Sequence, residues 1–162
     1  MLTGCSCCEH RDVTERPHTA CMPLITGHRR NTHEVELHEL PLFKGCRAKD
    51  LARLESLMTK LSLPAGRVVT RESEPGREFF IIAGGQAEVR RDAQLITTLG
   101  PGSFFGEMAL LDGGVRTATV IAVGDLEVYV LSDTEFRALV RSSPDVALNM
   151  LRSMSQRLRS AA

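Results

Sequence analysis

The chain has 162 residues, a length that fits one ordinary domain with a short extension. Apolar residues make up 43% and charged residues 25%, as in typical globular proteins, and no apolar run approaches the ~20 residues of a membrane span. Basic and acidic residues number 20 each, which argues against a duplex-DNA binder, because such domains usually carry a basic excess. With no signal-peptide pattern, we expect a cytoplasmic protein with reduced cysteines and no membrane contact.

The first 34 residues are expected to form an irregular N-terminal arm, and residues 35–162 to form one domain. The arm lacks apolar periodicity and holds four of the five cysteines and four of the five histidines. Its cysteine spacing, C-x-C-C-x12-C, matches no standard zinc or iron–sulfur pattern, so no metal site is expected. A metal or redox sensor built on these cysteines is kept as an alternative hypothesis.

A helical period marks the start of the domain, at Leu51, Leu54, Leu57, Met58 and Leu61. Pro64 and Gly66 are expected to end this helix. Arg47 stands at its start, where a capping Ser or Asp would be typical.

From residue 66 to residue 131, short apolar stretches alternate with Gly-rich turns at intervals of about ten residues. The expected strands are residues 67–72, 79–83, 86–91, 94–99, 116–123 and 125–131. This pattern predicts a small antiparallel barrel or jelly roll. Two helices should follow. The first is capped by Ser132 or Asp133, and the second has Pro144 in its first turn and an apolar stripe of Val146, Met150, Leu151, Met154 and Leu158.

The segment from Phe104 to Val120 is mostly apolar but carries two charged residues, Glu107 and Arg116. Gly106 allows close approach to the backbone, and one helical turn is expected to start at Glu107 with unpaired N–H groups that suit an anion. A guanidinium can donate two hydrogen bonds to a phosphate, and a carboxylate accepts from a sugar hydroxyl. Together these groups favour a nucleotide, although the two charges pairing with each other is the alternative.

The 16 residues "FGEMALLDGGVRTATV" resemble the phosphate-binding cassette of the cyclic nucleotide-binding domain family, approximately F-G-E-[LIM]-A-L-[LI]-x(2–4)-P-R-[AST]-A-[TS]-V. The similarity continues through "LPAGRVVTRESEPGREFFIIAGGQAEV" and "RSSPDVALNML", from about residue 37 to residue 158. It implies a mainly β fold, an eight-stranded antiparallel jelly-roll barrel with one N-terminal helix and two C-terminal helices.

The resemblance also implies the roles of individual residues. Glu107 would accept from the ribose 2′-OH, with Gly106 leaving room for the sugar, and Arg116 would pair with the cyclic phosphate. The remaining implied contacts are backbone N–H groups near Met108 and Ala109 and the hydroxyl of Thr117 for the phosphate, and the side chains of Val89 and Ile96 for the purine.

Three departures from the family pattern stand out. Val115 replaces the usual Pro before the Arg, which should loosen the turn. Arg77 stands where Asp often follows "EPG", so any ion pair made there is altered. The DNA-binding members have a long dimer-forming helix that caps the base, followed by a helix-turn-helix. This chain ends at Ala162, so neither a DNA-binding domain nor most of the base cap is expected.

We therefore expect a regulatory module that binds cAMP, is not an enzyme and needs no cofactor. cGMP stays open as the ligand, and cAMP is favoured by family frequency alone. Binding would be transmitted through the cassette to the C-terminal helices and read by a second copy of the chain or a separate effector. The alternative hypothesis is an interaction domain of the same fold that uses no nucleotide.

Overall fold

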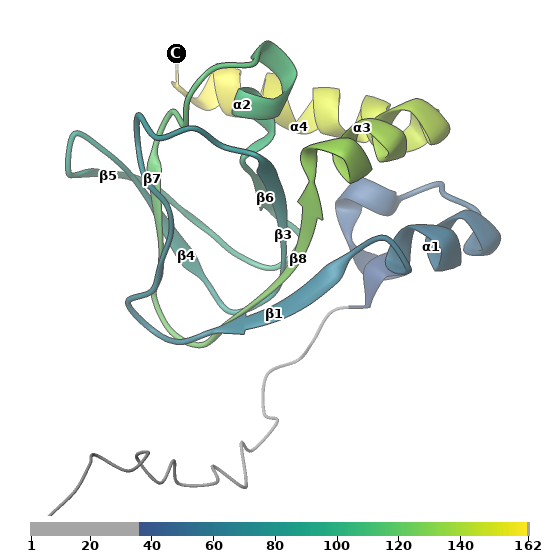
Figure 1. Ribbon diagram of the computed structural model, residues 1–162, viewed down its shortest axis with the longest axis horizontal. Helices are drawn as coiled ribbons and strands as arrows, with labels where there is room; N and C mark the ends of the chain where they lie inside the picture. Colours follow the sequence, from purple (N-terminus) through teal and green to yellow (C-terminus); the bar gives the residue numbers. More distant parts are fainter. Residues whose placement is uncertain (1–35, 162) are drawn as a thin grey trace, which may run out of the picture. The chain divides into compact units, whose positions relative to one another are not determined.

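The computed structural model describes residues 36–161, in which two four-stranded antiparallel sheets are flanked by helices (Figure 1). The strand order is β1-β8-β3-β6 in one sheet and β2-β7-β4-β5 in the other. The strands are β1 (Thr59–Leu63), β2 (Val68–Thr70), β3 (Glu78–Gly84), β4 (Ala87–Arg91), β5 (Gln94–Leu99), β6 (Phe104–Phe105), β7 (Thr119–Ala122) and β8 (Leu126–Ser132). The predicted eight-stranded jelly roll is confirmed.

The helices lie before, within and after the strands. They are the 3₁₀ turns η1 (Leu37–Glu39) and η2 (Pro41–Phe43), and the α-helices α1 (Ala48–Glu55), α2 (Glu107–Asp112), α3 (Asp133–Ser142) and α4 (Pro144–Ala161). The single helical turn predicted at Glu107 is thus present as α2, between β6 and β7. In Figure 1, α3 and α4 run along the same side of the barrel as α2.

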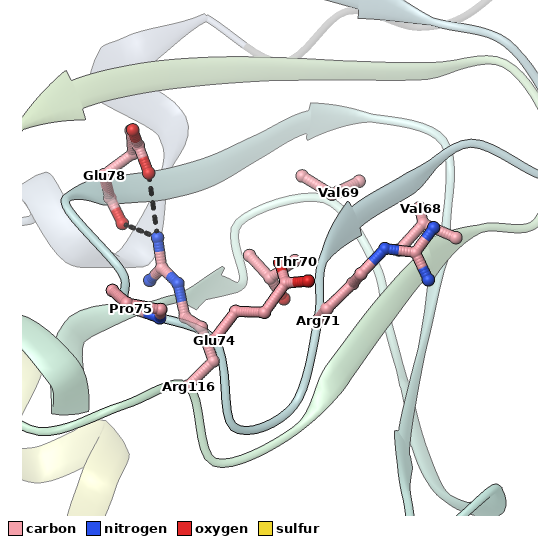
Figure 2. A pocket seen from close by; sticks show the side chains of 8 residues that line it. All are labelled: Val68, Val69, Thr70, Arg71, Glu74, Pro75, Glu78 and Arg116. Atoms are coloured by element: carbon pink, nitrogen blue, oxygen red, sulfur yellow. Dashed lines mark hydrogen bonds and ion pairs between the residues drawn. The ribbon is translucent and has the colours of Figure 1, made fainter.

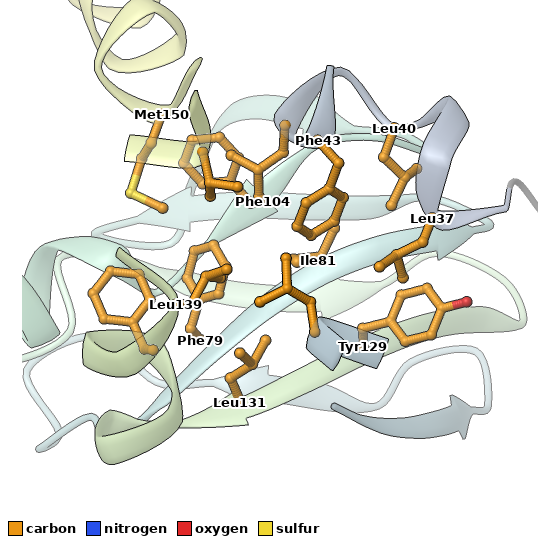
Figure 3. Packing of buried hydrophobic residues seen from close by; sticks show 14 of the residues in the cluster. Leu37, Leu40, Phe43, Phe79, Ile81, Phe104, Tyr129, Leu131, Leu139 and Met150 are labelled. Atoms are coloured by element: carbon orange, nitrogen blue, oxygen red, sulfur yellow. The ribbon is translucent and has the colours of Figure 1, made fainter. Parts of the chain in front are cut away.

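Strand β3 contributes side chains to two apolar cores, because successive side chains of a strand point to opposite faces of the sheet. Phe79 and Ile81 belong to the core beneath the helices, whereas Phe80 and Ile82 belong to the core inside the barrel. This explains why the sequence "FFIIA" is apolar at every position instead of alternating. Figure 3 shows the helix-side core, in which Phe79 lies among residues from β8, η2 and α4.

The N-terminal helix is shorter than the sequence pattern predicts. Helix α1 ends at Glu55, and Leu61 lies on strand β1 instead, with 41% of its surface exposed. Strand β1 pairs with β8 from Thr59↔Val130 to Leu63↔Leu126. The backbone hydrogen bonds of this pairing outweigh the weak helical propensity of the segment. The prediction that the helix extends as far as Leu61 was therefore wrong.

The two C-terminal helices begin as predicted. Ser132 caps α3 in a capping box with Glu135, and Pro144 is the first residue of α4. The predicted stripe on α4 is only partly correct, because Val146 and Met150 are buried but Leu151 and Leu158 are exposed.

Substituting Phe79 by Ala should lower the free energy of unfolding by about 3–5 kcal/mol, because it removes a fully buried ring. The ring lies 4.8 Å from that of Phe136 and 5.6 Å from that of Phe104, centroid to centroid. Urea denaturation measures the loss. The half-exposed Leu61→Ala is the control, and an equal loss in both variants would contradict this packing.

Candidate functional site

The cassette from Gly106 to Arg116 is shaped by glycine at its start. Gly106 has φ 88°, a left-handed conformation that ends β6 and begins α2. A Cβ atom there would lie 2.5 Å from Nη1 of Arg116 and 2.8 Å from the carbonyl oxygen of Glu78. Glycine is therefore required both by the backbone conformation and by the approach of the guanidinium.

Arg116 is buried at the wall of the barrel, with 5% of its surface exposed. Its Nη2 donates to the carbonyl oxygen of Glu78 at 2.8 Å and to the Glu78 carboxylate at 3.1 Å, and its Nη1 donates to the Gly106 carbonyl at 3.0 Å. The guanidinium also lies 5.8 Å from the centre of the Phe80 ring. Burial lowers the pKa of Arg116, and the ion pair with Glu78 opposes that shift.

Glu107 is equally buried, and its partner comes from the last helix. Nη1 of Arg157 donates to Oε1 of Glu107 at 3.2 Å, while Nη2 donates to the Phe104 carbonyl at 2.6 Å. Burial raises the pKa of Glu107, and the nearby Arg157 charge partly offsets this. The carboxylate thus lies inside the cassette, bonded to a cation from α4.

The two charges of the cassette therefore have separate partners on separate elements. Glu107 pairs with Arg157 on α4, and Arg116 pairs with Glu78 on β3. The alternative in which the two charges satisfy each other is not what the geometry shows.

Sequence reasoning missed Glu78 and Arg157. For Glu78 a signal existed, because Arg77 stands where Asp often follows "EPG" in the resemblance noted above, and Glu78 is the acid at the next position. For Arg157 no signal distinguished it from the other arginines of the C-terminal helices.

The other predicted site residues lie in or near the cassette and differ in how far they are exposed. Ala109 is buried in α2, and the Thr117 hydroxyl lies 3.8 Å from the sulfur of the exposed Met108. Val89 on β4 packs against the barrel core, whereas Ile96 on the edge strand β5 is 57% exposed. Their proposed contacts with the phosphate and the purine stay predictions.

A cavity of about 210 Å³ lies beside Arg116 (Figure 2). It is lined by β2 and by the loop that leads into β3, and Glu78 and Arg116 lie together at one side. Glu107 does not line it. The space next to the guanidinium is therefore separate from the Glu107–Arg157 pair in this structure.

Among residues 36–161, we find no cluster of three side chains that suits a metal ion, and no helix long and apolar enough to cross a membrane. The N-terminal cysteines, and with them the metal or redox hypothesis, lie outside the described residues.

These features define a jelly-roll domain with a buried ionic cassette between β6 and β7. The chain belongs to the cyclic nucleotide-binding domain family, whose profile matches residues 60–143. A cyclic AMP receptor protein of Thermus thermophilus is 32% identical over 126 residues, covering 75% of this chain and 58% of the relative.

Solved structures agree with this assignment. The crystal structure of the Thermus thermophilus catabolite activator protein has a TM-score of 0.67 and 32% identity, over 75% of this chain and 59% of that one. The regulatory domain of Toxoplasma gondii PKA, solved with cAMP, has a TM-score of 0.56 and 29% identity, over 61% of this chain and 40% of that one. The chain thus covers between 40% and 59% of the length of these relatives.

The pKa of Glu107 predicts how stability depends on pH. Burial raises the pKa from its usual 4.5, so the folded protein keeps this proton at pH values where the unfolded chain has lost it. Raising the pH through that window therefore lowers the free energy of unfolding.

Glu107→Gln cannot titrate. The stability of the wild type minus that of Glu107→Gln should fall as the pH rises above the usual pKa of 4.5, measured by urea denaturation. A difference that rises with pH would show that the Arg157 pair outweighs desolvation.

Proposed function

We propose that this domain binds cAMP and regulates a partner in response. The observation that carries the proposal is the burial of both Glu107, which begins the short helix α2, and Arg116, which follows that helix, in a cassette of the cyclic nucleotide-binding family. A buried cation suits the cyclic phosphate, and a buried carboxylate suits the ribose 2′-OH. Relatives named as cAMP receptor and cAMP-dependent kinase regulatory proteins support cAMP over cGMP.

Neighbouring groups would complete the ligand contacts. The amides of Met108 and Ala109 and the Thr117 hydroxyl would add donors for the phosphate. Val89 and Ile96 would pack against the purine, and the exposure of Ile96 leaves an apolar surface for the base to cover.

Helix α4 is the element that would report binding. Its first half is held to η2, because the Asn149 amide donates to the carbonyls of Leu42 and Lys44 at 3.1 and 2.9 Å. Its second half is held to the cassette by Arg157. A ribose hydroxyl that donates to Glu107 would compete with Arg157 and shift the position of the second half of α4.

We further propose that the domain acts by binding alone, without catalysis or a cofactor, in the cytoplasm. Its partner would be a second copy of the chain or a separate effector. Thr117, directly after the cassette, carries a hydroxyl that contacts a methionine sulfur and not a general base.

Isothermal titration calorimetry tests the proposal. The wild type should bind cAMP with micromolar or tighter affinity, and Arg116→Ala should weaken binding by about 2 kcal/mol or more, because a buried charge-assisted contact is lost. Arg67→Ala, at an exposed position, is the matched control. Absence of both cAMP and cGMP binding by the wild type would instead favour an interaction domain without a nucleotide.

The link between α4 and the cassette has its own test. Without nucleotide, Arg157→Ala should speed hydrogen exchange of the amides in the last two turns of α4, because it removes the bonds to Glu107 and Phe104. Arg159→Ala, on the same helix and exposed, should leave exchange unchanged. Equal rates in the two variants would contradict a role for Arg157 in holding the helix.

A further inference from the structure

The hydrogen bonds of Arg116 leave its guanidinium poorly prepared for a phosphate. Both Nη2 hydrogens are used by Glu78, one by its carbonyl oxygen and one by its carboxylate. A phosphate is bound best by two parallel N–H groups on one edge of the guanidinium. Both of the two-donor edges include Nη2, so bidentate binding requires that one Nη2 hydrogen be released.

The hydrogen bond to the Glu78 carboxylate is the one that can be broken. The carbonyls of Glu78 and Gly106 are fixed, the first in the β3–β8 ladder and the second in the left-handed turn before α2. The Glu78 side chain is 53% exposed and lies beside the 210 Å³ cavity, so it has room to rotate away (Figure 2).

The Glu78 carboxylate stabilises the protein when no ligand is bound. A buried cation without a counter-ion is unfavourable. The other acid of the cassette, Glu107, is already paired with Arg157. Glu78 is therefore the anion that compensates Arg116 in the free protein.

We propose that the Glu78 carboxylate is an internal counter-ion that the phosphate of the ligand displaces from Arg116. This inference rests on the proposed function and adds a residue that sets the affinity. Glu78 stabilises the free protein and opposes ligand binding, so its removal has two effects of opposite sign. A residue that merely positioned Arg116 would instead help both folding and binding.

The test compares the wild type with Glu78→Gln, which removes the charge but keeps the shape. By calorimetry, Glu78→Gln should bind cAMP about threefold to tenfold more tightly than the wild type. Without nucleotide it should also unfold at a lower temperature, and cAMP should raise its melting temperature by more than it raises that of the wild type. Glu39→Gln, an exposed carboxylate on η1, controls for the change in net charge and should change neither.

The outcomes separate this inference from the proposed function. Equal or weaker cAMP binding by Glu78→Gln, with normal binding by the wild type, would overturn the counter-ion role and leave the proposed function intact. Absence of nucleotide binding by the wild type would overturn both. If Glu78→Gln does not fold, Glu78→Asp serves instead. It keeps the charge on a shorter side chain, and binding no tighter than the wild type would overturn the proposal.

Discussion

The burial of the Arg116 guanidinium is the constraint on which the rest of the site depends. A cation with 5% exposure needs hydrogen-bond acceptors, and the chain provides them for Nη1 and Nη2 from β3 and from the turn before α2. Glycine at position 106 follows from this need, and so does Gly76, where a Cβ atom would lie 2.2 Å from Nε of Arg116. The glycines at positions 76 and 106 thus leave room for one charged side chain.

The fold places that group where it can affect distant elements. Strand β3 carries Glu78 at one end and alternates its apolar residues between the barrel core and the helix-side core. Through Arg157, helix α4 packs over the same cassette, with its guanidinium 4.5 Å from the centre of the Phe104 ring. The barrel and the C-terminal helix are therefore both tied to the cassette by ion pairs, the barrel through Glu78 and the helix through Arg157.

Much of the fold and part of the site were predictable from the sequence. The cassette motif indicated the family, the strand pattern predicted the jelly roll, and Ser132 or Asp133 was predicted to cap the helix that follows the strands. Strand β1 was not predictable, because its pairing with β8 involves residues far apart in the sequence and overrides the local helical period. Nor was Arg157, since only packing of α4 on the barrel brings it to Glu107, 50 positions earlier in the chain.

In the proposed function, the site recognises a phosphate and a ribose together, with the carboxylate of Glu107 accepting from the 2′-OH. The most direct measurement compares the binding of cAMP and 2′-deoxy-cAMP to the wild type by calorimetry. We expect loss of the hydroxyl to weaken binding by about 1–3 kcal/mol, because a buried carboxylate loses its hydrogen-bond donor. Equal affinity for the two nucleotides, or binding of neither, would contradict it.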